Sequence, residues 1–199
     1  MTEQLRIWAG LQGFLSLAAL VALALFFALA TPFTTEQSRW SWLGPVNDWL
    51  SVLGAVPWIV AMILVTLRMQ AGAAMWVFTI VASVGVTALA TVTLLMLAGR
   101  ADLQAQTIVA IPATVIAFAW IAGVAPALRA VSAIPPWVSV LAIVLFVALL
   151  VGAAAAGVGF LAPSGSPVQT GFYTAGAVIG GLAWFAFPIW WLAVASTAA

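Results

Sequence analysis

Four hydroxyl side chains recur at four-residue intervals in one long apolar stretch: Thr79, Ser83, Thr87 and Thr91. On an α-helix this spacing places them close to one face, because residues i and i+4 lie one above the other. In a membrane, such a hydroxyl bonds either to the carbonyl four residues earlier or to a group on another helix. We call these four side chains the hydroxyl seam. We expect one of two roles: Ser83 and Thr87 line a polar pathway, or the hydroxyl seam holds two helices together.

Asn47 and Asp48 place a carboxamide beside a carboxylate near the start of another apolar stretch. An ionisable side chain inside a membrane segment is a functional-site hypothesis by default. The depth here is shallow, however, and residues 44–48 resemble a helix start, where an acid is stabilised by the helix dipole. Asn47 and Asp48 are therefore candidates for ligand contact. The alternative is helix capping together with an ion pair from Asp48 to Arg39 or Arg100.

Three of the eleven tryptophans, Trp58, Trp120 and Trp184, fall deep in apolar stretches, where each indole N–H needs a partner. They predict either an aromatic pocket for a flat or apolar molecule, or ordinary core packing. Tyr173 follows a loop of polar turn-forming residues. We place any polar ligand contacts at this outer mouth and count Tyr173 among the candidate residues.

Pro57, Pro112 and Pro188 lie in the middle of apolar stretches. Each removes a backbone hydrogen bond and is expected to kink its helix. The carbonyl that loses its partner can coordinate a ligand or be satisfied by another helix. These prolines are hinge candidates, and kinks that only serve packing are the alternative.

The chain contains no lysine, histidine or cysteine, which removes most of the side chains that enzymes use. A retinal Schiff base, a histidine base or haem ligand, a thiolate nucleophile, an iron–sulfur cluster and a disulfide are excluded. We expect no enzymatic activity, no metal site and no cofactor. A membrane enzyme built on Glu36, Asp48 or Asp102 is the remaining alternative. A net charge of +1 indicates no nucleic-acid partner.

The elements that position these residues are membrane helices. Charged residues make up 5% of the 199 residues and hydrophobic ones 66%, and the mean hydropathy is +1.27. Each of six apolar runs is long enough to cross a bilayer core of about 30 Å. The predicted fold is all-α: a polytopic integral membrane protein that forms one transmembrane domain, a compact six-helix bundle with short loops. The predicted spans are residues 7–30, 45–67, 73–98, 102–128, 137–161 and 171–196. Gly99 is expected to end the third helix and Asp102 to cap the fourth.

Six spans place both termini on one side of the bilayer. Three arginines then lie on the side of the termini and two on the other, which favours cytoplasmic termini in a plasma or inner membrane. Residues 49–53 and 137–141 share the pattern W-[LV]-S-V-L. This match indicates either an inverted repeat, as in transporters, or a chance likeness between apolar helices. A GxxxG pattern at 176–180 permits close helix contact within the bundle or in a homo-oligomer.

Three functions fit this inventory. The leading one is a non-catalytic integral membrane protein, a subunit or scaffold that packs against another membrane protein or a lipid-like apolar molecule. The second is a small-solute transporter or channel with its mouth at the outer face. The third is the membrane enzyme described above. The lipid bilayer is the one partner common to all three.

Overall fold

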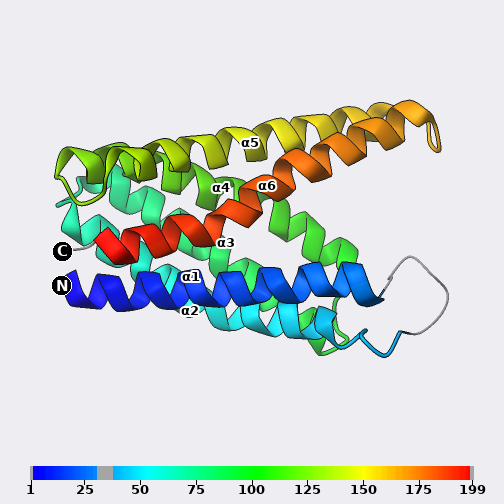
Figure 1. Cartoon of the computed structure of the whole chain (residues 1–199), viewed down its shortest axis with the longest axis horizontal. Coiled ribbons are helices and arrows are strands. Elements are labelled where there is room, and N and C mark those ends of the chain that lie inside the picture. Colours follow the sequence, from blue (N-terminus) through cyan, green and yellow to red (C-terminus); the bar gives the residue numbers. More distant parts are fainter. Residues whose placement is uncertain (1, 31–37, 198–199) are drawn as a thin grey trace.

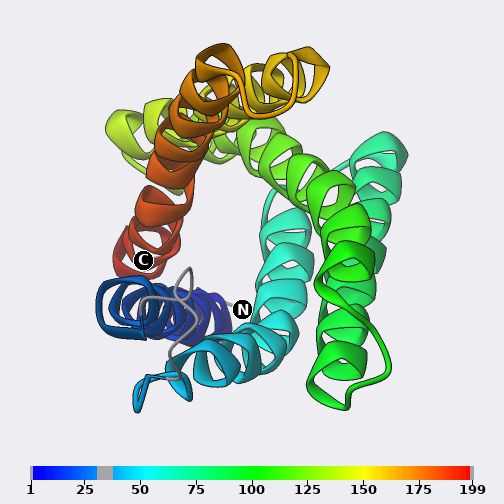
Figure 2. The ribbon, with the colours of Figure 1, turned by 90° about the vertical axis from the view of Figure 1, so that its right-hand side faces the viewer.

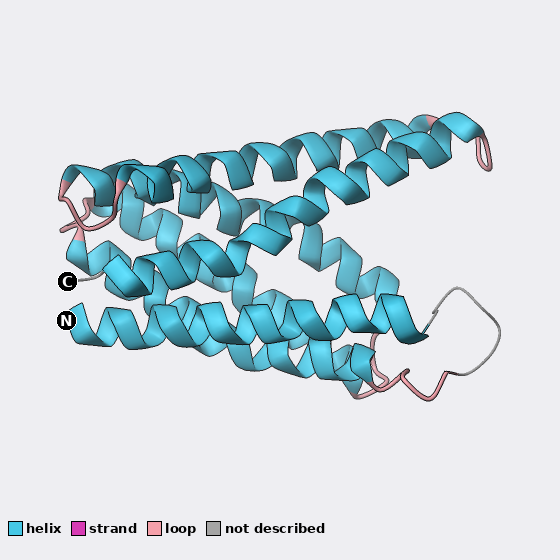
Figure 3. Ribbon diagram, viewed as in Figure 1, coloured by secondary structure: helices cyan, strands magenta, loops and turns pink. Residues whose placement is uncertain are grey.

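The computed structural model describes residues 2–30 and 38–197, and the described residues form helices joined by turns, without a strand (Figure 3). The helices are α1 (Thr2–Leu25), continued by a π-helical segment η1 (Phe26–Ala30), α2 (Leu43–Arg68), α3 (Ala73–Leu97), α4 (Leu103–Ala130), α5 (Pro136–Leu161) and α6 (Pro167–Thr197). All six are long and apolar enough to cross a membrane. The prediction of an all-α bundle of six membrane helices is confirmed.

The helices form a ring in chain order. Each packs against the next, and α6 closes the ring against α1 (Figures 1 and 2). The α5–α6 contact is the most extensive, followed by α1–α2. α1 begins and α6 ends at the same end of the bundle, which we call the terminal end (Figure 1). At the opposite end, α1 with η1 ends and α2 begins, and the turns α3–α4 and α5–α6 also lie there (Figure 1).

Packing is dense toward the terminal end and loose toward the opposite end. Fully buried side chains such as Met62, Ile121 and Trp190 lie in the terminal half. Where α5 ends, Phe160 and Leu161 are 77% and 84% exposed, so no other described helix covers them. In Figure 1 the α5–α6 hairpin diverges from α1 and α2 toward this end. The ring is therefore closed at one end and splayed at the other.

The turn between α3 and α4 forms as the sequence predicts. Gly99 has a φ of +68°, and Arg100 N–H donates to the Leu95 carbonyl at 2.8 Å, which is the Schellman arrangement. Asp102 caps α4, since its Oδ1 accepts a hydrogen bond from Ala105 N–H at 2.8 Å. Both ends of this turn are thus specified by local hydrogen bonds.

The sixth helix begins earlier than predicted, at Pro167 rather than at residue 171. Ser166 Oγ accepts from Gln169 N–H at 3.1 Å, and Gln169 Oε1 accepts from Gly165 N–H at 2.8 Å. Ser166 therefore caps the helix, with proline in the first turn, and Gln169 reaches back to the residue before the cap, a variant of the capping box. The helices also run unbroken through the three predicted hinge prolines, so the hinge role of Pro57, Pro112 and Pro188 stays a prediction.

Candidate functional site

A chamber of about 340 Å³ lies inside the ring, between α1, α2, α3 and α6. Its wall is made by residues 12–23 of α1, 47–58 of α2, 86–93 of α3 and 181–188 of α6. These segments belong to the looser part of the bundle, between its middle and its opposite end. Figure 2 looks onto that end, where the ribbons stand apart around the centre. The chamber is partly open, and its volume is at the lower end of the range for small-molecule sites.

The α6 wall of the chamber is apolar and aromatic. Gly181, Trp184, Phe185 and Pro188 all line the chamber, and their spacing of i, i+3, i+4 and i+7 places them on one face of the helix. Gly181 leaves open space, because a Cβ at this position would have no other atom within 4 Å. This face therefore offers room for an apolar body beside an indole ring.

An aromatic cluster separates the chamber from the terminal end. We define it as Trp58, Phe118, Trp120, Trp184, Phe187, Trp190 and Trp191. Phe187 is its centre: its ring centroid lies 4.8 Å from that of Trp58, 5.2 Å from that of Phe118 and 5.7 Å from that of Trp184. Trp190 and Trp191 continue the cluster, with centroids 4.7 Å apart. Phe187 lines the chamber and is 1% exposed, and Trp190 and Trp191 are fully buried, so this cluster forms an aromatic floor.

Uncharged polar groups occupy the α1, α2 and α3 walls. Gln12 Nε2 donates to Ser16 Oγ at 3.0 Å, and Ser51 Oγ donates to the Asn47 carbonyl at 2.9 Å. Thr93 Oγ1 accepts from Gln106 Nε2 at 3.0 Å. Every side chain that the structure places on the chamber wall is uncharged. The site can therefore hold a mainly apolar molecule and offer it a few hydrogen bonds.

Two polar atoms of chamber-lining residues are buried without a hydrogen-bond partner among the described residues: Gln12 Oε1 and Trp58 Nε1. Gln12 is 1% exposed and Trp58 7%. Buried polar groups in folded proteins nearly always have a partner, so each such atom calls for an explanation.

Four of the predicted site residues meet at the chamber: Asn47, Trp58, Trp184 and Pro188 all line it. Asp48 lies beside the wall, where its Oδ1 accepts from Asn47 Nδ2 at 3.1 Å. These residues come from two helices that are distant in sequence. The ring brings them together.

The predicted ion pair of Asp48 with Arg39 or Arg100 does not form. No salt bridge to Asp48 occurs within residues 2–30 and 38–197, and the Arg39 guanidinium lies over the Trp40 ring, 5.2 Å from its centroid. Arg100 is exposed in the turn before α4. Asp48 is the sixth residue of α2, beyond the first turn, where the dipole of the helix stabilises an acid most. Glu36, another acid of the enzyme alternative, lies outside the described residues.

The hydroxyl seam of α3 lies apart from the chamber wall. Ser83 Oγ donates to the Thr79 carbonyl at 2.7 Å and Thr87 Oγ1 to the Ser83 carbonyl at 2.9 Å, so both bond back to their own helix. Thr79 alone of the seam bonds across helices: its Oγ1 lies 2.8 Å from Thr66 Oγ1 and accepts from Trp120 Nε1 at 2.9 Å. Trp120 is thus held in the core, away from the chamber.

Tyr173 and Pro112 also lie away from the chamber wall. Tyr173 is 42% exposed on α6 and packs against Gly159 of α5, where a Cβ would come within 2.9 Å of its ring. Pro112 is exposed on α4, and Pro57 is buried within α2. Their predicted roles stay predictions.

Sequence reasoning missed several polar residues on the chamber wall, namely Gln12, Ser16, Ser51 and Thr93, as well as Phe187 at its floor. One signal was available: Gln12 and Ser16 are a polar pair at i and i+4 inside the first apolar run. Side chains so placed share one helix face, and hydrocarbon disfavours them unless they face the interior.

No protein-family model, curated protein or solved structure matches this chain.

Proposed function

We propose that this chain is a non-catalytic, multi-pass membrane protein that binds a lipid-like apolar small molecule in the chamber of its helical ring. The observation that carries the proposal is the chamber: about 340 Å³ of space with an apolar α6 wall and an aromatic floor. Concave, mainly apolar sites with a few polar groups are the usual form of small-molecule sites. Trp58 and Trp184, both members of the aromatic cluster, line this space.

The non-catalytic part of the proposal rests on the side chains. Within the described residues, no three acidic groups come together in one site. Asp102 is engaged in capping α4, and Asp48 accepts from Asn47. Acid–base catalysis needs positioned groups with matched proton affinities. A chamber wall whose polar groups are amides, hydroxyls and indoles is better suited to binding a ligand than to acid–base catalysis.

Transport is the second candidate, and one observation favours it. The chamber is partly open, whereas the aromatic cluster blocks the way toward the terminal end. A carrier that exposes its site to one side at a time has this form in one of its two states. In such a carrier, the cluster around Phe187 has to part in the other state.

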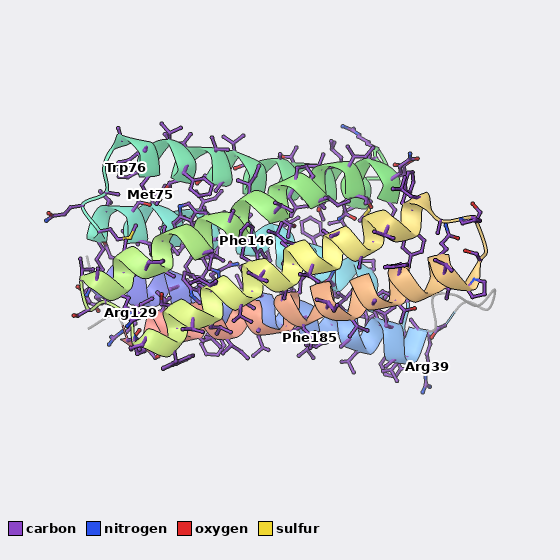
Figure 4. All side chains as sticks on the ribbon, turned by 90° about the horizontal axis from the view of Figure 1, so that it is seen from above. Arg39, Met75, Trp76, Arg129, Phe146 and Phe185 are labelled. Atoms are coloured by element: carbon purple, nitrogen blue, oxygen red, sulfur yellow. The ribbon has the colours of Figure 1, made fainter. Side chains whose placement is uncertain are left out.

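The same proposal includes the orientation of the chain. Arg129 lies at the terminal end and Arg39 at the opposite end (Figure 4). Arg6, near the start of α1, and Arg68, whose Nη1 donates to Thr2 Oγ1 at 2.9 Å, also belong to the terminal end. Positive residues accumulate on the cytoplasmic side of membrane proteins. We therefore place the terminal end in the cytoplasm and the chamber toward the outer face of the plasma or inner membrane.

Native mass spectrometry after gentle extraction tests the proposed function. The unmodified protein is expected to retain a small apolar molecule in stoichiometric amount. The change Gly181→Phe adds a benzyl group on the chamber face, where a Cβ meets no atom within 4 Å, and should abolish retention. Gly171→Phe is the matched control: it lies on the same helix, a Cβ there also meets nothing within 4 Å, and it is remote from the chamber.

Two results would contradict the proposal. One is that both variants retain the same molecule in the same amount as the unmodified protein. The other is that a second membrane protein co-purifies in stoichiometric amount while the chamber carries no small molecule. The second result would support the role of a subunit or scaffold instead.

A further inference from the structure

The two unpartnered polar atoms of chamber residues differ in chemistry. Gln12 Oε1 is a hydrogen-bond acceptor, and Trp58 Nε1 is a donor. Two further indole N–H groups without partners, those of Trp190 and Trp191, lie in the aromatic cluster and not on the chamber wall. They lie edge-on to each other, at 80° and 4.7 Å between centroids. Of these four unpartnered atoms, only those of Gln12 and Trp58 belong to residues that line the chamber.

The acceptor and the donor lie on neighbouring levels of the wall. Gln12 Oε1 is 3.4 Å from the position that a Cβ on Gly54 would take. Gly54 and Trp58 are one helical turn apart on α2, about 6 Å along the axis. Because Gly54 has no side chain, the carboxamide of Gln12 lies close to the backbone of α2, one helical turn from Trp58 along the chain. Gln12 and Trp58 thus occupy neighbouring levels of the chamber wall.

We propose that the chamber recognises an uncharged molecule with a flat apolar body and one small polar group that both donates and accepts a hydrogen bond, such as an alcohol. The polar group donates to Gln12 Oε1 and accepts from Trp58 Nε1. The apolar body lies against Trp184 and the apolar face of α6. This inference rests on the proposed function and specifies its ligand.

The absence of charge on the wall decides against an ionic group. Asp48 is beside Asn47 at the edge of the chamber, but its carboxylate does not line it. Moving an ion from water into such a site costs far more than hydrogen bonds to an amide and an indole return. The aromatic floor, in turn, favours a flat body, because ring faces stack on indoles and on Phe187.

Four probes that share a naphthalene ring test the inference. They carry a secondary alcohol, the matching methyl ketone, the matching ethyl group, or a carboxylate. Their affinities are measured by equilibrium dialysis against nanodiscs that hold the unmodified protein. Nanodiscs that hold the Gly181→Phe variant give the background from partition into lipid. The alcohol should bind roughly 5- to 100-fold more tightly than the ethyl compound, the ketone should fall between them, and the carboxylate should not bind.

Two variants assign the polar contacts. Gln12→Leu removes the acceptor and keeps most of the volume, and Trp58→Phe removes the donor and keeps an aromatic ring. Each should reduce the preference for the alcohol over the ethyl compound by several fold. This preference is a ratio measured on one preparation, so it does not depend on the fraction of folded protein. Gln4→Leu and Trp137→Phe, which change exposed residues at the terminal end, should leave the ratio unchanged.

The outcomes separate this inference from the proposed function. If the alcohol and the ethyl compound bind equally, or if both variants keep the full preference, the two polar atoms bind only water and the inference is wrong. The proposed function then stands, provided that Gly181→Phe abolishes binding. Tighter binding of the carboxylate, or of a matching ammonium compound, would also overturn the inference. If none of the probes binds above the Gly181→Phe background, the flat-molecule class is wrong, and a molecule retained in native mass spectrometry still supports the proposed function.

Discussion

Replacing Gly152 by alanine should separate α5 from α6. A Cβ on Gly152 would lie 2.6 Å from the backbone nitrogen of Gly180, 2.8 Å from its Cα and 2.9 Å from the carbonyl oxygen of Gly176. These are backbone atoms, so no side chain can turn aside. Restoring an ordinary contact of 3.4 Å requires a movement of about 0.8 Å across the most extensive helix contact of the bundle.

The cost follows from two opposing effects. Alanine is the better helix former, and the change gains about 1 kcal/mol from helix propensity. Overpacking of a close contact costs about 1–3 kcal/mol, and opening the rest of the interface weakens its dispersion contacts. Gly157→Ala has the same propensity gain on the same helix, but its Cβ meets nothing within 4 Å. The two variants should therefore differ in free energy of unfolding by about 1–3 kcal/mol, with Gly152→Ala the less stable.

Gly180, which faces Gly152 across the α5–α6 interface, gives a second control for Gly152→Ala. A Cβ on Gly180 would approach Gly152 Cα no closer than 3.9 Å, so Gly180→Ala should be tolerated although it changes the same interface. Unfolding in mixed micelles, followed by tryptophan fluorescence, measures all three variants. Equal stability of Gly152→Ala and Gly157→Ala would refute the packing argument. So would a loss for Gly180→Ala as large as that for Gly152→Ala.

Three further predictions concern other contacts. Thr79→Val leaves the buried indole N–H of Trp120 without its acceptor and should lower the free energy of unfolding by about 1–3 kcal/mol. Thr87 is exposed and bonds only to its own helix, so Thr87→Val should change the free energy of unfolding little. The chain has no native cysteine, so a thiol reagent labels only an introduced one. Ser51→Cys, on the chamber wall, should react with a charged thiol reagent, and Ser83→Cys should not. Equal labelling rates would favour the interpretation of the hydroxyl seam as a pathway. Asp102→Ala should lower the free energy of unfolding by about 1 kcal/mol, and Asp102→Asn should retain the cap; an equal loss in both would mean that the capping bond contributes nothing.

The hydroxyls of the Thr66–Thr79 contact show why some outcomes lie beyond sequence reasoning. The two hydroxyls make three close contacts: they contact each other, Thr66 Oγ1 contacts the Met62 carbonyl, and Thr79 Oγ1 contacts the Met75 carbonyl. Because they carry two protons, at most two of these contacts are hydrogen bonds at one time. The spacing of the seam predicted a shared face, but not which of its members meets another helix. That depends on how α3 is rotated against α2 and α4.

The aromatic residues show the same difference between what the sequence predicts and what helix packing decides. Trp58, Trp120 and Trp184 were all candidates for one pocket, because all three are deep in their spans. Trp58 and Trp184 line the chamber, whereas Trp120 donates to Thr79 and does not line it. Phe187, which contacts four members of the cluster, was not singled out at all. A phenylalanine in an apolar helix gives no signal of its own.

By itself the sequence determined the environment, the number of helices and the turn at Gly99 and Asp102. Hydropathy over some 20 residues decides insertion, and capping bonds join residues only a few positions apart. The tertiary structure decided which sides of the helices face one another. These helices are apolar all round, so no polar stripe marks an inner face, and lipid contacts an apolar face as readily as another helix does. Closure of α6 onto α1 and the close approach at Gly152 set the rotations, and these rotations bring Gln12, Trp58 and Trp184 to one chamber.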